Sequence, residues 1–138
     1  MDLYEYSVIR IVPDVEREEF INIGLIMMCK RRRWLKIKFA PLPTSLKHIF
    51  PFIDIENLQR HICSFQCTGE GEKGYGPIAQ LETEERFRWL TAVKSAVIQT
   101  SRPHPGLAMS LEETFEHLFN RLVIRTEIAD IAVQEKSN

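Results

Sequence analysis

Residues 4–39 read YEYSVIRIVPDVEREEFINIGLIMMCKRRRWLKIKF, and three strands are predicted within them. In residues 4–12 the side chains alternate between two faces, which is the period of a β-strand, and Pro13 is expected to end this strand. The segment Phe20–Cys29 is mostly apolar, which is typical of a central strand buried on both faces. Alternation returns in Trp34–Phe39. The three segments together predict an antiparallel meander.

Two amphipathic helices are predicted after the meander. Asp54 can cap a helix that extends to about Cys67, and Ser110 with Glu113 forms a capping box that opens another. Apolar residues recur along both helices at the spacing of one helical face. Between the two helices the sequence predicts a shorter helix capped by Thr83, then a fourth strand at residues 97–101, and then a loop at residues 102–106.

The predicted fold class is α+β, with a mainly antiparallel sheet of three to four strands and the helices packed on one face. Residues 1–125 are expected to form a single domain, and residues 126–138 a C-terminal arm or tail. The three cysteines have no CxxC spacing, and the N-terminus has no signal-peptide pattern. These features predict reduced thiols and a cytoplasmic location. No apolar run reaches the length of a membrane span.

Two ordered motifs carry a resemblance to a known family. Residues 4–24 read Y-x-Y-S-V-I-R-I-V-P-D-x-E-R-x-E-F-x-N-I-G, and residues 76–92 read G-P-I-x-x-L-x-x-x-E-R-F-R-W-L-T-A, followed by S-x-V-I-Q-T-S at 95–101 and H-x-G-L at 104–107. The chain resembles the bacterial domain-of-unknown-function family 3037 up to about Val123. The resemblance implies a compact single domain and supplies no catalytic residues. Because members are sometimes encoded next to kinases similar to HipA, it also suggests a kinase-like partner.

Polar functional groups are concentrated in residues 85–106. Arg86 could bind a carboxylate or phosphate, and His104 could exchange protons near neutral pH. Arg10 and Asn22 are polar side chains in otherwise apolar strands, so each needs a partner or a ligand. The alternative is structural, with Arg86 and Arg10 paired to acidic residues and Asn22 satisfied locally. The candidate ligand-binding residues are Arg10, Asn22, Arg86, Ser95, Gln99 and His104.

A basic segment surrounds the predicted turn between the second and third strands. Seven lysines and arginines, and no acidic residue, lie between Glu19 and Asp54, although the net charge of the chain is only −1. A basic hairpin with an aromatic residue could follow a nucleic-acid backbone and stack a base. The same pattern fits an edge strand protected by lysines. The nucleic-acid-binding candidates in this 30–38 hairpin are Lys30, Arg31, Arg32, Arg33, Trp34 and Lys36.

No complete catalytic, metal or cofactor pattern is recognisable. Cys63 and Cys67 lie four residues apart on a predicted helix, but two thiols do not make a zinc site. The glycine-rich residues 68–76 do not form a P-loop, and no G-x-S-x-G motif occurs. We therefore predict no metal and no cofactor, and leave open the oligomeric state and whether the chain is an enzyme.

The leading functional hypothesis is a non-enzymatic interaction or regulatory module, with a HipA-like kinase as a possible partner. One alternative is a nucleic-acid-binding protein that uses the 30–38 hairpin. Another is a small anion- or nucleotide-binding enzyme or sensor that uses the region from Arg86 to His104.

Overall fold

The computed structural model describes residues 1–14, 16, 19–92 and 97–124. The predicted C-terminal arm, residues 126–138, lies outside these residues. Along the described chain the elements are β1 (Asp2–Asp14), β2 (Glu19–Cys29), β3 (Trp34–Phe39), α1 (Leu46–Ile49), α2 (Ile55–Gly69), the short 3₁₀ helix η1 (Ile78–Gln80), α3 (Thr83–Leu90), β4 (Ile98–Thr100), β5 (His104–Ala108) and α4 (Leu111–Leu122).

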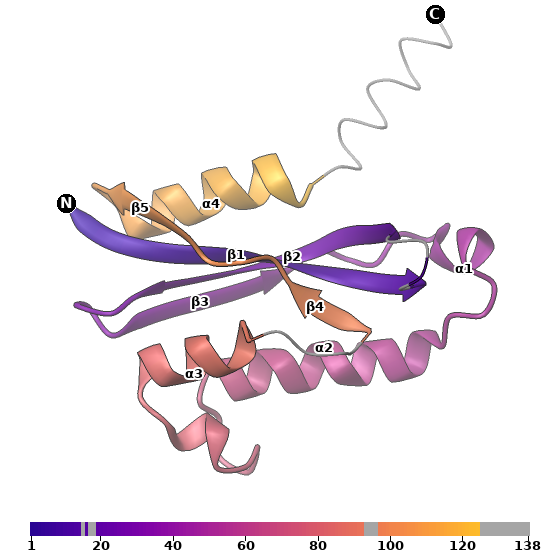
Figure 1. Ribbon diagram of the computed structural model, residues 1–138, viewed down its shortest axis with the longest axis horizontal. Coiled ribbons are helices and arrows are strands. Elements are labelled where there is room, and N and C mark those ends of the chain that lie inside the picture. The colour runs from indigo at the N-terminus through magenta and orange to yellow at the C-terminus, as the bar shows by residue number, and fades with distance from the viewer. Residues whose placement is uncertain (15, 17–18, 93–96, 125–138) are drawn as a thin grey trace, which may run out of the picture.

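The sheet is built on the predicted meander. Its order is β3-β2-β1-β4, and every pairing is antiparallel (Figure 1). β1 continues through Pro13, where we expected it to end, to Asp14. The α+β class and the antiparallel sheet are therefore confirmed.

The outer edge of β1 is filled by two short strands instead of one. β4 pairs with Ile9–Ile11, and β5 pairs with Asp2–Tyr6. Ser101 bridges the break between them, because its N–H donates to the carbonyl of Val8 at 2.8 Å and its hydroxyl accepts the N–H of Val8 at 2.9 Å. The hydroxyl thus takes the place of a missing backbone acceptor and keeps the edge of β1 satisfied.

β5 adds a fifth strand where we predicted a loop. The prediction rested on Pro103 and Pro105, which are unusual in strands. Proline is tolerated at the edge of a sheet, where its nitrogen faces outward and needs no hydrogen bond. β5 lies at such an edge, so the two prolines did not exclude a strand.

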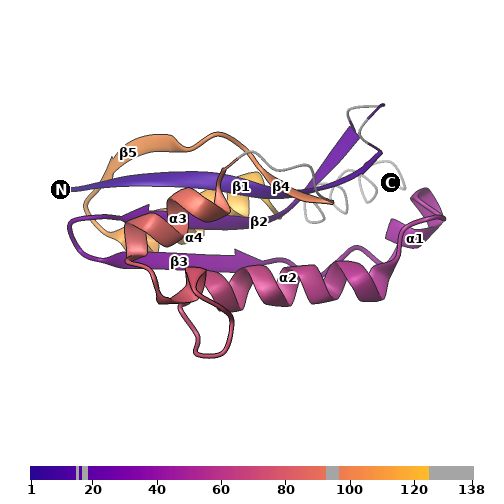
Figure 2. The ribbon, with the colours of Figure 1, turned by 60° about the horizontal axis from the view of Figure 1, so that its bottom comes forward.

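Helices cover both faces of the sheet, with α4 on one face and α2 and α3 on the other (Figure 1). A turned view shows α2 running alongside β3 (Figure 2). The prediction of helices on one face was therefore wrong. The reason lies in β2, where Leu25 and Met27 are buried beneath α4 while Ile26 and Met28 are buried on the opposite side. A strand with two apolar faces requires a cover on each.

Capping side chains start the two long helices as predicted. The Asp54 carboxylate accepts the N–H of Asn57 at 3.0 Å, and the Ser110 hydroxyl accepts the N–H of Glu113 at 3.3 Å. α3 begins one residue earlier than predicted, with Glu82 instead of Thr83 as its N-cap. Among the described residues, no helix combines the length and apolar character that a membrane crossing requires.

Candidate functional site

Three of the predicted ligand-binding residues form a row across three strands. Arg10 in β1 pairs directly with Asn22 in β2 on one side and with Gln99 in β4 on the other. Directly opposed residues of antiparallel strands point to the same face. The neighbouring Val8 lies in the core beneath α4, so this polar row lies on the α4 face of the sheet.

Arg10 and Asn22 are only partly satisfied in this row. The Arg10 guanidinium lies over the ring of Phe20, 4.2 Å from its centroid, and burial lowers the pKa of Arg10. Asn22 donates from Nδ2 to the carbonyl of Leu122 at the end of α4, at 3.1 Å. Within the described part of the chain, Arg10 Nε and Asn22 Oδ1 have no hydrogen-bond partner although both are buried. The row retains hydrogen-bonding capacity beside the end of α4.

Arg86 does not join the polar row. It lies in α3, on the opposite face, where its Nε donates to the carbonyl of Gly69 at 3.0 Å and its Nη1 to the carbonyl of Leu81 at 2.6 Å. We expected an acidic partner in the structural alternative, and the partners are instead two backbone carbonyls. Arg86 therefore ties the end of α2 to the residue that follows η1.

His104 lies on the α4 face but not in the row. It pairs with Tyr6, and the two rings are 5.2 Å apart between centroids. Arg10 lies four residues further along β1, so His104 and Arg10 occupy different ends of the strand. Ser95 falls outside the described residues. The five predicted ligand-binding residues that the structure describes thus do not converge on one site, although three of them are neighbours.

Most of the basic 30–38 hairpin is engaged by acidic side chains. Ion pairs join Lys30 to Glu84 at 3.4 Å and Arg32 to Asp2 at 3.0 Å. Arg31 and Arg33 are exposed and form no ion pair within the described chain. These two are the hairpin's available cations.

A cluster that we call the charged clasp joins β3 to α4. Lys36 pairs with Glu112 at 2.6 Å and with Glu116 at 3.4 Å, and Lys38 pairs with Glu116 at 3.1 Å. Trp34 donates its indole N–H to Glu112 at 3.3 Å, and its ring packs edge-on against Phe115. The clasp consists of Lys36, Lys38, Glu112 and Glu116. Trp34 and Lys36 are therefore engaged with α4.

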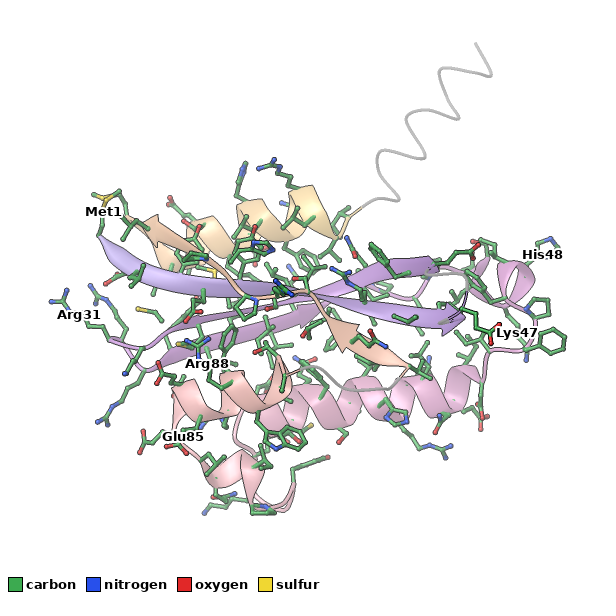
Figure 3. All side chains as sticks on the ribbon, viewed as in Figure 1. Met1, Arg31, Lys47, His48, Glu85 and Arg88 are labelled. Atoms are coloured by element: carbon green, nitrogen blue, oxygen red, sulfur yellow. The ribbon has the colours of Figure 1, made fainter. Side chains whose placement is uncertain are left out.

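A groove of about 790 Å³ opens where β1 and β5 meet the turn between β2 and β3. We call it the sheet-end groove. Met1 and Arg31 project at this end of the molecule, and Glu85 lies on the adjoining start of α3 (Figure 3). The groove is lined by Met1, Leu3, Leu107, Lys30, Arg31, Arg33 and Glu82–Glu85.

The sheet-end groove has an apolar floor and a charged rim. Leu3 and Leu107 are paired across β1 and β5, and their side chains remain 64% and 61% exposed. The turn contributes basic groups to one side of the rim, and the start of α3 contributes acidic groups to the other. An apolar centre with a polar border is characteristic of protein–protein interfaces. Within the described residues, no cluster of three or more potential metal ligands occurs.

The sequence analysis did not identify this groove. Leu3 and Leu107 are 104 positions apart, and only the pairing of β5 with β1 makes them neighbours. Since β5 was predicted as a loop, the pairing was not expected. Pro105, the proline within β5, is of a residue type that edge strands tolerate and was the signal that could have indicated one.

A family model described as "Protein of unknown function (DUF3037)" matches residues 6–123. The match spans the polar row, most of the sheet-end groove and the sheet apart from the first four residues of β1, so Met1 and Leu3 precede it. Neither the curated proteins nor the solved structures contain a match to this chain.

Proposed function

The chain belongs to the DUF3037 family of proteins of unknown function, and from its structure we propose that it is a non-enzymatic interaction module that binds a protein partner in the sheet-end groove. The observation that carries the proposal is the apolar floor. Single exposed apolar side chains are ordinary, but a contiguous group beside a groove is typical of interaction sites. Met1, Leu3 and Leu107 line the groove together, and each is more than half exposed.

Burial of this floor would favour association. Full burial of one leucine or methionine side chain contributes about 1.5–3 kcal/mol. Leu3 and Leu107 already lie in two paired strands, β1 and β5, so little backbone conformational entropy is lost when a partner covers them. Burial of the floor would therefore supply binding energy for a non-enzymatic interaction.

The rim limits which partner fits. Arg31 and Arg33 stand on one side without ion pairs in the described chain, while Lys30 is already paired with Glu84. Acidic side chains on a partner would find cations there. We propose a partner segment with apolar residues flanked by acidic ones. The family resemblance makes a HipA-like kinase the first partner to test.

The other two hypotheses receive less support from the geometry. Nucleic-acid binding would require free cations, and Lys30, Arg32 and Lys36 are held in ion pairs. A small anion-binding enzyme or sensor would require Arg86 near His104, and Arg86 instead holds two backbone carbonyls on the opposite face of the sheet.

The test is co-purification of the tagged chain from its native host, with two matched variants. Leu107→Asp places a charge on the groove floor, and Phe52→Asp does the same at a fully exposed side chain elsewhere. We expect a partner that is retained by the wild type and by Phe52→Asp but lost by Leu107→Asp. A HipA-like kinase from the host is then co-expressed to test it directly.

Two outcomes would contradict the proposal. One is recovery of the same proteins by all three forms. The other is recovery of the chain alone under low-salt conditions. Light scattering on the purified chain shows whether a second copy of the chain is the partner.

A further inference from the structure

A second concave surface, which we call the aromatic pocket, lies between α2, α3 and β4. Its volume of about 320 Å³ is at the lower end of the range for small-molecule sites. The residues that matter here are Tyr75 and Trp89, which carry aromatic rings, and Ser64, Thr68 and His61, which carry polar groups. The pocket shares no lining residue with the sheet-end groove among the described residues, although α3 contributes to both.

Two large aromatic rings border this pocket without being buried. Trp89 is 46% exposed and Tyr75 is 42% exposed. Aromatic rings gain most when covered, so two half-exposed rings beside one cavity provide a surface for a ligand.

The loop between α2 and η1 is built to place Tyr75 at the pocket. Gly74 and Gly76 flank Tyr75 with φ of +91° and +90°, values that side-chain-bearing residues rarely adopt. Arg86 holds both ends of the loop through the carbonyls of Gly69 and Leu81. Arg86 thus helps to position Tyr75. This role explains why Arg86 binds backbone carbonyls and contacts no acidic group in the described structure.

The polar side chains in the described lining include the hydroxyls of Ser64 and Thr68 and the imidazole of His61. No lysine, arginine, aspartate or glutamate is among the described residues that line it. A hydrogen bond with the Cys67 thiol raises the pKa of Tyr75 to about 12, so its phenol stays neutral at physiological pH. A charged ligand would meet no carboxylate, ammonium or guanidinium group among the described lining residues, whereas hydroxyl groups can pair with an uncharged polar edge.

We propose that the aromatic pocket binds a small, uncharged, planar heteroaromatic molecule of about nucleobase size. Its ring lies against Trp89 and Tyr75, and its polar edge faces the hydroxyls of Ser64 and Thr68. Stacking on exposed aromatic rings favours planar ligands over saturated ones of the same size. The inference does not rest on the interaction role proposed above.

The first experiment uses Trp89 as its own reporter. Trp34→Phe leaves Trp89 as the sole tryptophan, since the chain contains two. The probes are adenine, uracil and nicotinamide as uncharged planar rings, AMP as a charged form of one of them, and cyclohexanecarboxamide as an uncharged saturated ring. We expect a saturable change in Trp89 fluorescence with at least one planar uncharged probe in the millimolar range, weaker binding of AMP than of adenine, and no response to the saturated ring.

The second experiment locates the binding. Trp89→Leu should lower the affinity for the responding probe by about tenfold, which is within the range seen when an aromatic stacking partner is removed. Titrations followed by amide chemical shifts measure this affinity. Ser64→Ala should weaken it less, and Phe52→Leu should leave it unchanged. Trp89, Ser64 and Phe52 are all exposed, so the fold should be kept in each variant.

Three results would overturn the inference. They are the absence of saturable binding by every planar probe, equal binding of the saturated ring, and unchanged affinity in Trp89→Leu.

Discussion

The α4 face of the sheet and the face beneath α2 and α3 are covered by different means. On the α4 face a single helix packs Phe115 and Phe119 into the core, and the charged clasp ties its flank to β3. On the other face two helices bury a larger set of aliphatic side chains around Phe87, and the ion pair between Arg88 and Glu5 lies at one end. Ion pairs therefore tie both covers to the sheet, from α4 to β3 on one face and from α3 to Glu5 and Lys30 on the other, and the face beneath α2 and α3 buries more aliphatic side chains.

Buried side chains and surface ion pairs give the cover of each face two kinds of sensitivity. Burial responds mainly to changes in side-chain volume, whereas surface ion pairs respond to pH and salt. The two exposed sites also differ, because the sheet-end groove combines apolar and charged groups, whereas the described lining of the aromatic pocket contains no lysine, arginine, aspartate or glutamate. The following predictions test whether the two faces behave as one unit or as two.

The largest effect is expected from removing a buried ring on either face. Phe87→Ala and Phe115→Ala should each lower the free energy of unfolding by about 3–5 kcal/mol, because both side chains are fully buried and leave a cavity. Urea unfolding can be followed at Trp34 on the α4 face and at Trp89 on the other, using variants with one tryptophan. We expect the two transitions to coincide. Separate transitions would show that α4 unfolds independently.

A smaller effect is expected at the break between β4 and β5. Ser101→Ala removes the hydroxyl that accepts the N–H of Val8 and leaves a buried donor unpaired. This change should cost about 1–3 kcal/mol in urea unfolding. Ser101→Thr keeps the hydroxyl and serves as the control. Equal stability of the alanine and threonine variants would show that the hydroxyl does not stabilise the edge.

The charged clasp should make stability depend on pH. Hydrogen bonds from Lys36 and Lys38 lower the pKa of Glu112 and Glu116 below their ordinary value of 4.5. Their contribution is therefore present above that value and is lost as the pH falls through the lower pKa of the folded state. Lys36 has its pKa raised above 10.5, chiefly by Glu112, so its contribution is lost only above that pH.

Glu116→Gln tests the clasp directly. At neutral pH it should cost less than about 1 kcal/mol, because the pairs are partly exposed and screened. The variant should also lose less stability than the wild type between neutral and acidic pH. Urea unfolding at several pH values measures both quantities. If the free energy of unfolding changed in parallel with pH in the two proteins, the charged clasp would not be the source of the pH dependence.

The smallest effect on stability is expected in the sheet-end groove. Leu107→Asp should change the free energy of unfolding by no more than about 0.5 kcal/mol, because its side chain is already 61% exposed. Thermal unfolding of the variant and the wild type measures this. A large loss would mean that Leu107 supports the fold, and loss of a partner by this variant would then not identify the groove as the binding site.

The elements that sequence could predict are those with a strong local period. The meander, the helix capped by Asp54 and the helix capped by Ser110 follow from alternation, helical spacing and capping groups. The choice of face could not be derived in this way, because it depends on how each connection crosses the sheet. The apolar character of β2 on both sides was the one local signal that both faces are covered.

The candidate sites show the same limit more clearly. Arg10, Asn22 and Gln99 were singled out separately, and only the register of three strands made them neighbours. Arg86 had the residue type of an anion-binding group, yet its donors meet backbone carbonyls that have no sequence signature. Leu3 and Leu107 have no distinguishing pattern until β5 is placed beside β1.

The proline in β5 has a consequence for how the molecule behaves in concentrated solution. An unprotected edge strand with apolar side chains invites other chains to add strands and form open-ended aggregates. Pro105 lies within β5 and has no N–H to offer an incoming strand. The edge can therefore expose Leu107 and Met109 to water with less risk of polymerisation. Pro105, which led us to predict a loop, thus helps to limit strand addition at an edge that exposes apolar side chains.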